Sequence, residues 1–116
     1  DVSELTITKS VSPVPVSENG ILTYTFIIQN SGNTAADVSS NIVITDIFNP
    51  ILSNLTVTLD GVTLPTTSYT YNETTGEFAT VAGSITVPAA TYTQSATEGF
   101  YIINPGVTTL TISGTV

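Results

Sequence analysis

The sequence predicts an all-β protein, a β-sandwich of about seven to nine strands. Thr makes up about a fifth of the 116 residues, and Val, Ile and Leu dominate the apolar set. This composition favours strands because branched side chains suit a pleated surface. Short runs of alternating apolar and polar residues are separated by turn residues roughly every eight to twelve positions. No window places apolar residues at helical spacing between helix caps. The length suits one two-layer domain over residues 1–116.

The first expected strand covers residues 2–11. The segment after it contains prolines, which cannot donate a backbone hydrogen bond to a neighbouring strand. Four side chains share the face expected to point inward: Leu5, Ile7, Lys9 and Val11. Pro13 and Pro15 lack a backbone N–H, so the chain must kink or run along an edge there. Glu18-Asn19-Gly20 supplies the turn into the next strand.

The second and third expected strands alternate clearly. Residues 22–29 place four apolar side chains on one face: Leu22, Tyr24, Phe26 and Ile28. The turn residues of 30–33, Asn-Ser-Gly-Asn, end this strand. Residues 42–48 place four further side chains on one face: Ile42, Ile44, Asp46 and Phe48. Asn49-Pro50 ends the third strand.

The second half of the chain predicts several shorter strands. Asp60-Gly61 is the strongest hairpin signal, since a type I′ turn needs residues that accept positive φ. A tight turn is expected at Asn104-Pro105-Gly106, after a core strand at 100–103. The expected strands of this half are residues 55–59, 62–64, 68–71, 77–81, 84–87, 100–103 and 107–116.

Composition excludes several classes of function. The chain has one basic residue and nine acidic ones, a formal charge of −8. It therefore lacks the cations that neutralise nucleic-acid phosphates or anionic lipids. The absence of Cys and His removes disulfides, thiolate chemistry and the usual general base and metal ligand. No apolar run reaches membrane length, so no membrane insertion is expected. We expect no enzyme activity, cofactor, metal ion or nucleic-acid partner.

Four segments together resemble a known family: LTITKSVSP, GILTYTFIIQNSGNTAADV, NIVITDIFNPILSNLTVTLDGVTL and NPGVTTLTISGTV. Their order and spacing are similar to the cell-surface repeat domain of bacteria and archaea called the domain of unknown function numbered eleven. The resemblance implies an immunoglobulin-like sandwich, usually in tandem copies on secreted or wall-attached proteins, without catalytic activity. The segment Asp46-Ile47-Phe48-Asn49-Pro50 departs from the family pattern, which tends to have Leu-Pro close after the Asp.

Lys9 is the residue most suggestive of special chemistry. Alternation places it on an inward face, where an unpaired charge is very costly, and places Asp46 on the corresponding face of the third strand. Three outcomes remain open: Lys9 reaches solvent at the strand end, pairs with Asp46, or loses its proton and forms an isopeptide bond. For the cross-link, Asp46 and Asn104 are the possible acceptors and Glu98 the possible proton-shuttling acid.

Three weaker patterns have simpler explanations. Asn54 and Asn72 each begin an N-glycosylation sequon, a pattern that arises by chance in Thr-rich chains. A sugar-stacking patch of tyrosines is conceivable, although cross-strand aromatic pairs explain such residues equally well; its members are Tyr69, Tyr71 and Tyr92. Six acids suggest calcium, although solvated turn acids are the simpler interpretation; they are Asp37, Asp46, Asp60, Glu73, Glu77 and Glu98.

The sequence therefore predicts a non-catalytic structural module of an extracellular protein of the cell surface or wall. It would serve as a stalk repeat or as a fibre or filament subunit. The partners expected are neighbouring copies or adjacent repeats, contacted through the terminal strands at 2–11 and 107–116 because terminal strands are free to pair or swap. The alternative is an adhesion or carbohydrate-binding module, which exposed aromatic residues between 69 and 92 would favour.

Overall fold

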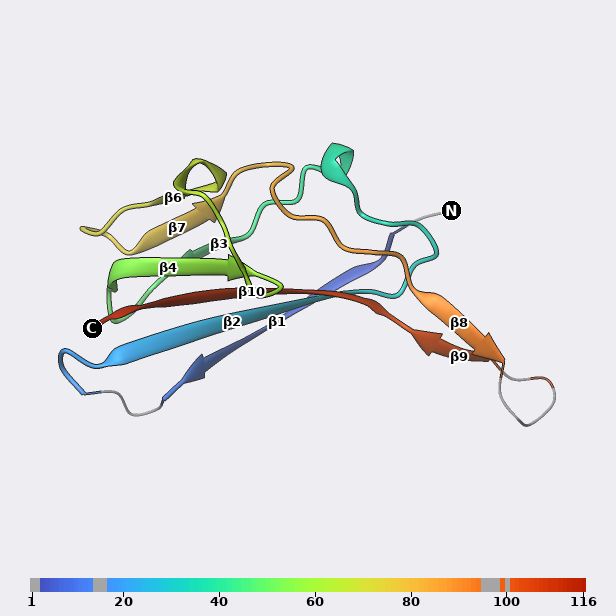
Figure 1. Ribbon diagram of the computed structural model, residues 1–116, viewed down its shortest axis with the longest axis horizontal. Coiled ribbons are helices and arrows are strands. Elements are labelled where there is room, and N and C mark those ends of the chain that lie inside the picture. The colour runs from blue at the N-terminus through green and yellow to red at the C-terminus, as the bar shows by residue number, and fades with distance from the viewer. Residues whose placement is uncertain (1–2, 14–16, 95–98, 100) are drawn as a thin grey trace.

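A computed structural model of the chain describes residues 3–13, 17–94, 99 and 101–116. Within them the protein is all-β, with ten strands and two short 3-10 helices (Figure 1). The strands are β1 (Leu5–Ser12), β2 (Ile21–Asn30), β3 (Thr45–Ile47), β4 (Ser53–Leu59), β5 (Val62–Thr63), β6 (Tyr69–Tyr71), β7 (Glu77–Thr80), β8 (Thr91–Gln94), β9 (Tyr101–Asn104) and β10 (Gly106–Thr115). The helices are η1 (Val38–Ser40) and η2 (Thr66–Ser68).

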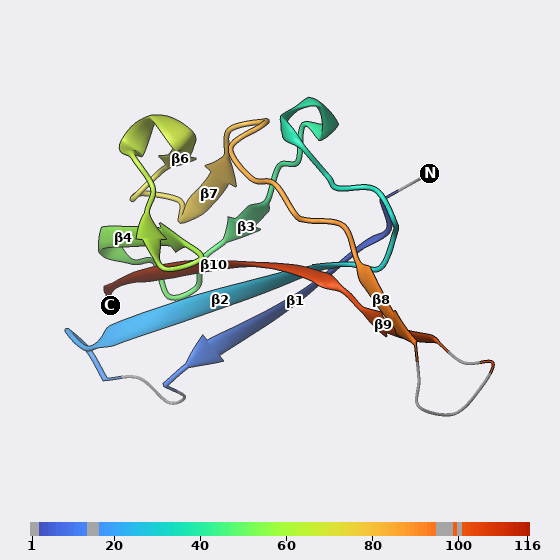
Figure 2. The ribbon, with the colours of Figure 1, turned by 45° about the vertical axis from the view of Figure 1, so that its right-hand side comes forward.

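The strands form two facing sheets and a separate hairpin. The larger sheet has the order β1-β2-β10-β4-β5, and the smaller one has the order β3-β7-β6. Figure 1 and Figure 2 both show the smaller sheet above the larger one, while the β8–β9 hairpin extends away from the two layers. We call this hairpin, residues 91–94 and 101–104, the arm. The two-layer arrangement confirms the predicted all-β class and is the arrangement expected of a β-sandwich.

The core lies between the two sheets and follows the predicted alternation. Every second residue of β2 is buried because successive side chains of a strand point to opposite faces. The buried residues come from both layers and from the connections between them: Leu22, Tyr24, Phe26, Ile28, Ala36, Ile44, Phe48, Leu52, Val57, Phe78, Ile85, Val87, Leu110 and Ile112. Phe48 is central, since its ring stacks on Tyr24 at 4.5 Å and on Phe78 at 5.6 Å between centroids. Aromatic contacts therefore join β2 to the smaller sheet.

The last strand holds the larger sheet together. β10 pairs with β2 on one side and with β4 on the other, so both of its edges are occupied. In an immunoglobulin constant domain the last strand lies instead in the three-stranded sheet. The expectation that residues 107–116 offer a free strand to a neighbour is therefore wrong, and only β1 among the terminal strands lies at a sheet edge.

Several predicted elements are confirmed and three are wrong. The Asp60-Gly61 hairpin joins β4 to β5, with both turn residues at positive φ. Residues 84–87 form no strand and pair only through an isolated bridge between Ala36 and Val87. The tight turn at 104–106 is absent, because only Pro105 separates β9 from β10. β9 is exposed along its whole length and is not a core strand.

β1 follows its predicted phase but not its predicted burial. Ile7, Lys9 and Val11 oppose Ile28, Phe26 and Tyr24, so they point to the core side of the sheet. Nevertheless every residue of β1 is exposed, and Ile7 keeps 52% of its surface in solvent. The reason is geometric: the smaller sheet covers the β2–β10–β4 part of the larger sheet and leaves its β1 edge open (Figure 2).

Candidate functional site

The Lys9 and Asp46 side chains meet between the two sheets, at their adjacent edges. Lys9 lies on β1 opposite Phe26, and Asp46 lies on β3 opposite Phe78. The Lys9 Nζ is 2.5 Å from Asp46 Oδ2, and the side chains are 42% and 20% exposed, respectively. The two edge strands thus bring the chain's only basic side chain against a carboxylate. Asp46 is the partner that strand alternation predicts for Lys9.

The surroundings of the pair complete its electrostatics. Asp46 Oδ1 accepts a hydrogen bond of 2.9 Å from the Ile47 backbone N–H. Asp46 Oδ2 is shielded from solvent and receives no well-aligned hydrogen bond in the described part of the chain, although the Lys9 ammonium lies against it. The ammonium also lies 5.0 Å from the centroid of the Tyr24 ring. The Lys9 ammonium therefore compensates the charge of an acid that is largely out of water, and the Tyr24 ring in turn stabilises the ammonium.

The geometry combines two of the three outcomes left open for Lys9. The side chain reaches solvent and at the same time pairs with Asp46. A lysine this exposed keeps much of its hydration, whereas amine nucleophiles are activated by desolvation, so the contact supports an ion pair. The isopeptide bond stays an untested prediction, and Glu98 lies outside the described residues.

Asn104, the asparagine acceptor considered for the cross-link, lies away from Lys9. Asn104 is on the arm, where its Nδ2 donates to Thr93 Oγ1 at 2.9 Å. In the strand register Lys9 pairs with Phe26 and Gly106 pairs with Asn30, four residues further along β2. Asn104 lies two residues beyond Gly106, so it is about six residues from Lys9 along the strand direction, roughly 20 Å at about 3.3 Å per residue. The structure therefore brings Asp46 to Lys9 and does not bring Asn104 there.

A groove runs beside this pair, along the open side of the sandwich. One part has a volume of about 330 Å³ and is lined by Ile7, Lys9, Phe26, Val43, Ile44, Thr45 and Asp46. The adjoining part, of about 160 Å³, is lined by Leu5, Thr6, Ile7, Ile28, Ile42, Val43 and Ile44. We call the two parts together the edge groove. Its lining is mostly aliphatic, which suits another apolar surface better than a polar small molecule.

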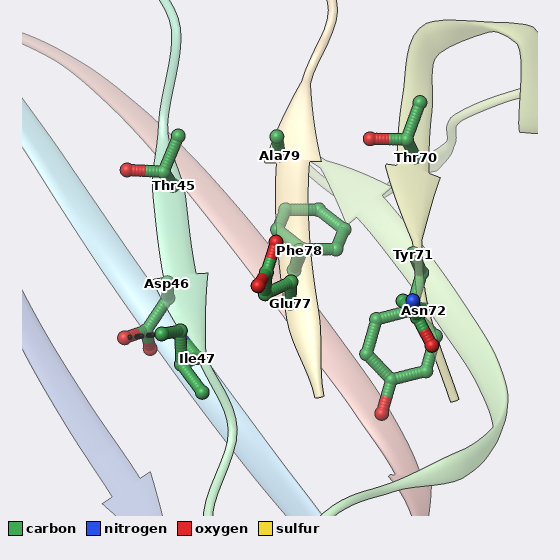
Figure 3. Close-up of a pocket in the computed structure, with 9 residues that line it drawn as sticks. All are labelled: Thr45, Asp46, Ile47, Thr70, Tyr71, Asn72, Glu77, Phe78 and Ala79. Carbon is green, nitrogen blue, oxygen red and sulfur yellow. Dashed lines mark hydrogen bonds between the residues drawn. The ribbon is translucent and has the colours of Figure 1, made fainter. Parts of the chain in front are cut away.

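A second concavity lies on the smaller sheet and has a volume of about 430 Å³. Figure 3 shows its lining residues on the three strands, with Asp46 at one edge and Tyr71 and Asn72 at the other. Nine residues line it: Thr45, Asp46, Ile47, Thr70, Tyr71, Asn72, Glu77, Phe78 and Ala79. Glu77 and Asp46 are its acids, and Asp46 is already paired with Lys9. The concavity therefore offers one unengaged carboxylate among hydroxyl and apolar groups.

Two of the other acids, Asp37 and Asp60, accept hydrogen bonds from backbone N–H groups. The Ser39 hydroxyl and backbone N–H donate to Asp37 Oδ1 at 2.6 and 3.0 Å, and these hydrogen bonds hold the pKa of the Asp37 carboxyl below its ordinary value. Asp60 Oδ1 accepts a hydrogen bond of 2.8 Å from the Thr109 backbone. Among the described residues, acidic side chains nowhere gather in a group of three that suits a metal ion.

The predicted tyrosine patch does not exist as one surface. Tyr69 and Tyr71 pack against the core, and the Tyr71 hydroxyl donates to Leu52 O at 2.6 Å and accepts from Leu52 N at 3.0 Å. Burial raises the pKa of the Tyr71 hydroxyl above its ordinary value. Tyr92 lies apart on the exposed arm. The two sequon asparagines, Asn54 and Asn72, are both exposed.

Sequence reasoning missed two features: the exposed arm and the buried side chain of Asn30. Asn30 is completely buried at the end of β2 and forms four side-chain hydrogen bonds. The sequence places it in a turn, where an Asn is expected to face solvent, so no signal marked its burial. The sequence predicts residues 100–103 as a core strand and predicts no strand at 91–94, because a short apolar run looks the same whether or not a second layer covers it.

A scan against protein-family models found no match, and searches of curated proteins and of solved structures found no similar protein. The resemblance to the cell-surface repeat family therefore stays a prediction. In the described part of the chain, no helix is long and apolar enough to cross a membrane.

Proposed function

We propose that the protein is a non-catalytic structural module of an extracellular surface protein, a stalk repeat or a fibre subunit that contacts neighbouring copies of itself. The observation that carries the proposal is the apolar face of the arm, which nothing in the described chain covers. Such a surface is unusual for a small domain that works alone.

The arm concentrates large apolar side chains on one face. In the β8–β9 register Tyr92 opposes Ile103 and Gln94 opposes Tyr101, so these four side chains share a face. Tyr92, Ile103 and Tyr101 are 50%, 54% and 69% exposed. The arm lies away from both sheets in Figure 1 and Figure 2, which makes this face accessible to a second molecule. Exposed aromatic residues are also the residues most enriched at protein interfaces.

For association between copies of the chain, charge favours the arm as the place of contact. Copies that each carry a formal charge of −8 repel one another over most of their surfaces. The described residues of the arm, Thr91–Gln94 and Tyr101–Asn104, contain no charged side chain. Two copies therefore approach with the least repulsion where this arm is one of the two surfaces.

The shape suits a spacer. The molecule measures 55 × 32 × 20 Å, with the arm at one end of its long axis (Figure 1). β10 runs through the larger sheet with a ladder on each side, so a load along that strand acts on many hydrogen bonds in parallel. Exposure at the cell surface is consistent with a Thr-rich chain of low charge density, and this part of the proposal rests on composition alone.

The test compares two charge insertions on exposed apolar residues. Ile103→Asp places a carboxylate on the arm face, and Val62→Asp places one on β5, where Val62 is 70% exposed. Sedimentation velocity from about 1 μM to about 100 μM protein, below the millimolar effective concentration of a segment tethered within its own chain, measures association. We expect the wild type and Val62→Asp to associate with increasing concentration and Ile103→Asp to remain a single chain. A wild type that stays a single chain throughout, or equal behaviour of the two variants, contradicts the proposal.

The alternative, an adhesion or carbohydrate-binding module, has lost part of its basis because Tyr69 and Tyr71 face the core. Tyr92 and Tyr101 of the arm are the aromatic residues left to stack on a sugar. Binding of soluble polysaccharide by a wild type that does not self-associate, abolished by Tyr101→Ala, would favour this alternative.

A further inference from the structure

β1 is attached to the rest of the fold by a small set of contacts. It forms a ladder with β2 alone, and each of its eight residues is exposed. One ion pair, Lys9 to Asp46, links it to the smaller sheet. Just before β1, Glu4 adds two backbone hydrogen bonds, one to the Asn30 side chain and one from Ser31. The strand is thus fixed in register while little of it is enclosed.

The position of β1 in the sheet allows it to leave without displacing another strand. It lies at the edge of the larger sheet, where it pairs with β2. Eight residues, 13–20, connect it to β2, and they include Pro13 and Pro15. Hairpin connections are commonly two to five residues long, so this linker is longer than a hairpin needs.

The site that β1 fills has to be occupied. Without β1, one edge of β2 would present unpaired backbone N–H and C=O groups along eight residues. Tyr24, Phe26 and Ile28 would also lose their neighbours on that side. A second β1 of the same sequence is the strand that restores each of these contacts, because the register, the apolar face and the cation all match.

We propose that β1 is exchanged between copies, so that β1 of one copy occupies the β1 site of the next. The exchange rests on the proposed function, since its partner is another copy of the chain, and it names a second element, besides the arm, through which copies join. In the exchanged form Lys9 pairs with Asp46 of the neighbouring copy. Each copy gives one strand and receives one. Exchange with a different neighbour on each side repeats head to tail and extends into a filament, whereas reciprocal exchange between two copies closes a dimer.

The Lys9–Asp46 pair fixes the register of the exchanged strand. A slip of one residue turns every side chain of a strand to the opposite face. Such a slip would carry the ammonium to the outer face of the sheet and leave the shielded Asp46 Oδ2 without its cation. The ion pair therefore selects the matching alignment, whichever copy supplies β1.

Concentration decides between the closed and exchanged forms, because both contain the same β1 contacts. A strand on a short tether reaches its own site at an effective concentration in the millimolar range. We expect the closed form in dilute solution, and exchange above roughly 1 mM or where copies are crowded on a surface.

Cysteine pairs report exchange directly, because the native chain contains no Cys. Thr8 and Ile27 oppose each other on the outer face of β1 and β2. The Cα atoms of opposed antiparallel residues lie about 4.5–5.5 Å apart, within disulfide range. A chain with Thr8→Cys and a chain with Ile27→Cys are mixed in denaturant, refolded together at roughly 1 mM, diluted and oxidised. Non-reducing electrophoresis then measures the covalent heterodimer.

Two controls test whether the heterodimer reports strand exchange. Thr8→Cys mixed with Thr63→Cys tests random collision, since Thr63 lies on β5 at the opposite edge of the same sheet. Thr8→Cys and Ile27→Cys in one chain, refolded in dilute solution, confirms that the disulfide closes. We expect several-fold more heterodimer from the Thr8 and Ile27 mixture than from the control mixture. Equal yields, or no heterodimer while the double variant closes, would overturn the exchange.

Charge reversal provides an independent measurement. A Lys9→Asp chain places two carboxylates together at this site, and an Asp46→Lys chain places two ammonium groups together. This holds for the closed form and for exchange between identical chains. Only exchange between the two types restores opposite charges, so the mixture should contain up to about fivefold more exchanged dimer than either chain alone. A mixture that equals the average of its components argues against exchange.

The two proposals fail separately. If the wild type associates through the arm without forming the disulfide heterodimer, the structural function stands and the exchange does not. If the heterodimer forms and Ile103→Asp has no effect on association, the exchange stands and the arm contact does not.

Discussion

Asn30 offers the sharpest test of how the fold is held together, because its side chain joins three separate segments. Its Oδ1 accepts from Glu4 N at 3.0 Å and from Gly32 N at 2.9 Å. Its Nδ2 donates to Thr34 O at 2.8 Å and to Pro88 O at 3.2 Å. The residue is completely buried, so water cannot replace these partners without a rearrangement. Asn30→Ala therefore removes four hydrogen bonds at once.

The magnitude follows from these contacts. Each hydrogen bond contributes about 1 kcal/mol net, and a buried group left unpaired costs about 1–3 kcal/mol. The backbone N–H of Glu4 lies at an exposed residue and can be solvated, whereas Gly32 is buried. We expect Asn30→Ala to lower the free energy of unfolding by about 3–5 kcal/mol. A chain of this size has roughly 6–17 kcal/mol in total, so the loss is a large fraction of its stability.

Urea unfolding followed by circular dichroism measures this change. Gln29→Ala, an exposed residue of the same strand, is the matched control, and we expect it to change stability by less than about 0.5 kcal/mol. A loss of less than about 1 kcal/mol for Asn30→Ala would refute the reasoning, because the four hydrogen bonds would then contribute little.

Asn30→Asp tests the same site by pH. It keeps the shape but faces an oxygen toward the Thr34 and Pro88 carbonyls. Burial and these carbonyls raise the pKa of the introduced carboxyl in the folded state. The folded state then binds the proton more tightly, so stability is present at acid pH and is lost as pH rises through the folded pKa. We expect the variant to be closer to the wild type at pH 3 than at pH 7. An equal deficit at both pH values contradicts this account.

Three further substitutions have defined outcomes. Tyr71→Phe removes both hydrogen bonds to Leu52 and should cost about 1–3 kcal/mol in urea unfolding. Because burial raises the pKa of the Tyr71 hydroxyl, its contribution to wild-type stability should be complete below the unfolded pKa of 10 and should be lost as pH rises through the folded pKa. The same dependence of stability on alkaline pH in the Phe variant would contradict this. Gly106→Ala places a Cβ 1.8 Å from Pro88 O, so the backbone must shift, and we expect a loss of about 1–3 kcal/mol in thermal unfolding; no loss would mean that this contact relaxes freely. Lys9→Gln should lower the free energy of unfolding by no more than about 1 kcal/mol, because the lysine is partly exposed. Urea unfolding at low and high salt measures this change, and a larger loss that does not depend on salt would contradict an ion pair.

Local pattern predicted the parts of this fold that depend on local physics. The alternation of β2 identified its buried face because a half-buried strand repeats every two residues. Asp60-Gly61 identified a hairpin because both of its residues adopt positive φ. Alternation also identified Asp46 as a partner for Lys9, since it assigns both residues to inward faces.

The remaining features depend on how far one layer extends over another, which a local pattern does not contain. Ile103 belongs to an apolar run that predicts a core strand, but nothing in the described part of the chain forms a second layer over the arm. Ile7 faces the core side and stays half exposed because the smaller sheet ends before β1. Asn30 reads as a turn residue, and its burial depends on Pro88, which is 58 positions away in the chain. Long-range packing decided each of these outcomes.

Negative-stain electron microscopy of the wild-type chain at high concentration tests the central claim most directly, namely that copies of this chain join one another. The account predicts unbranched fibres whose axial repeat does not exceed the 55 Å long dimension of one chain. A field of separate particles the size of a single chain, at concentrations where tethered strands exchange, would contradict it.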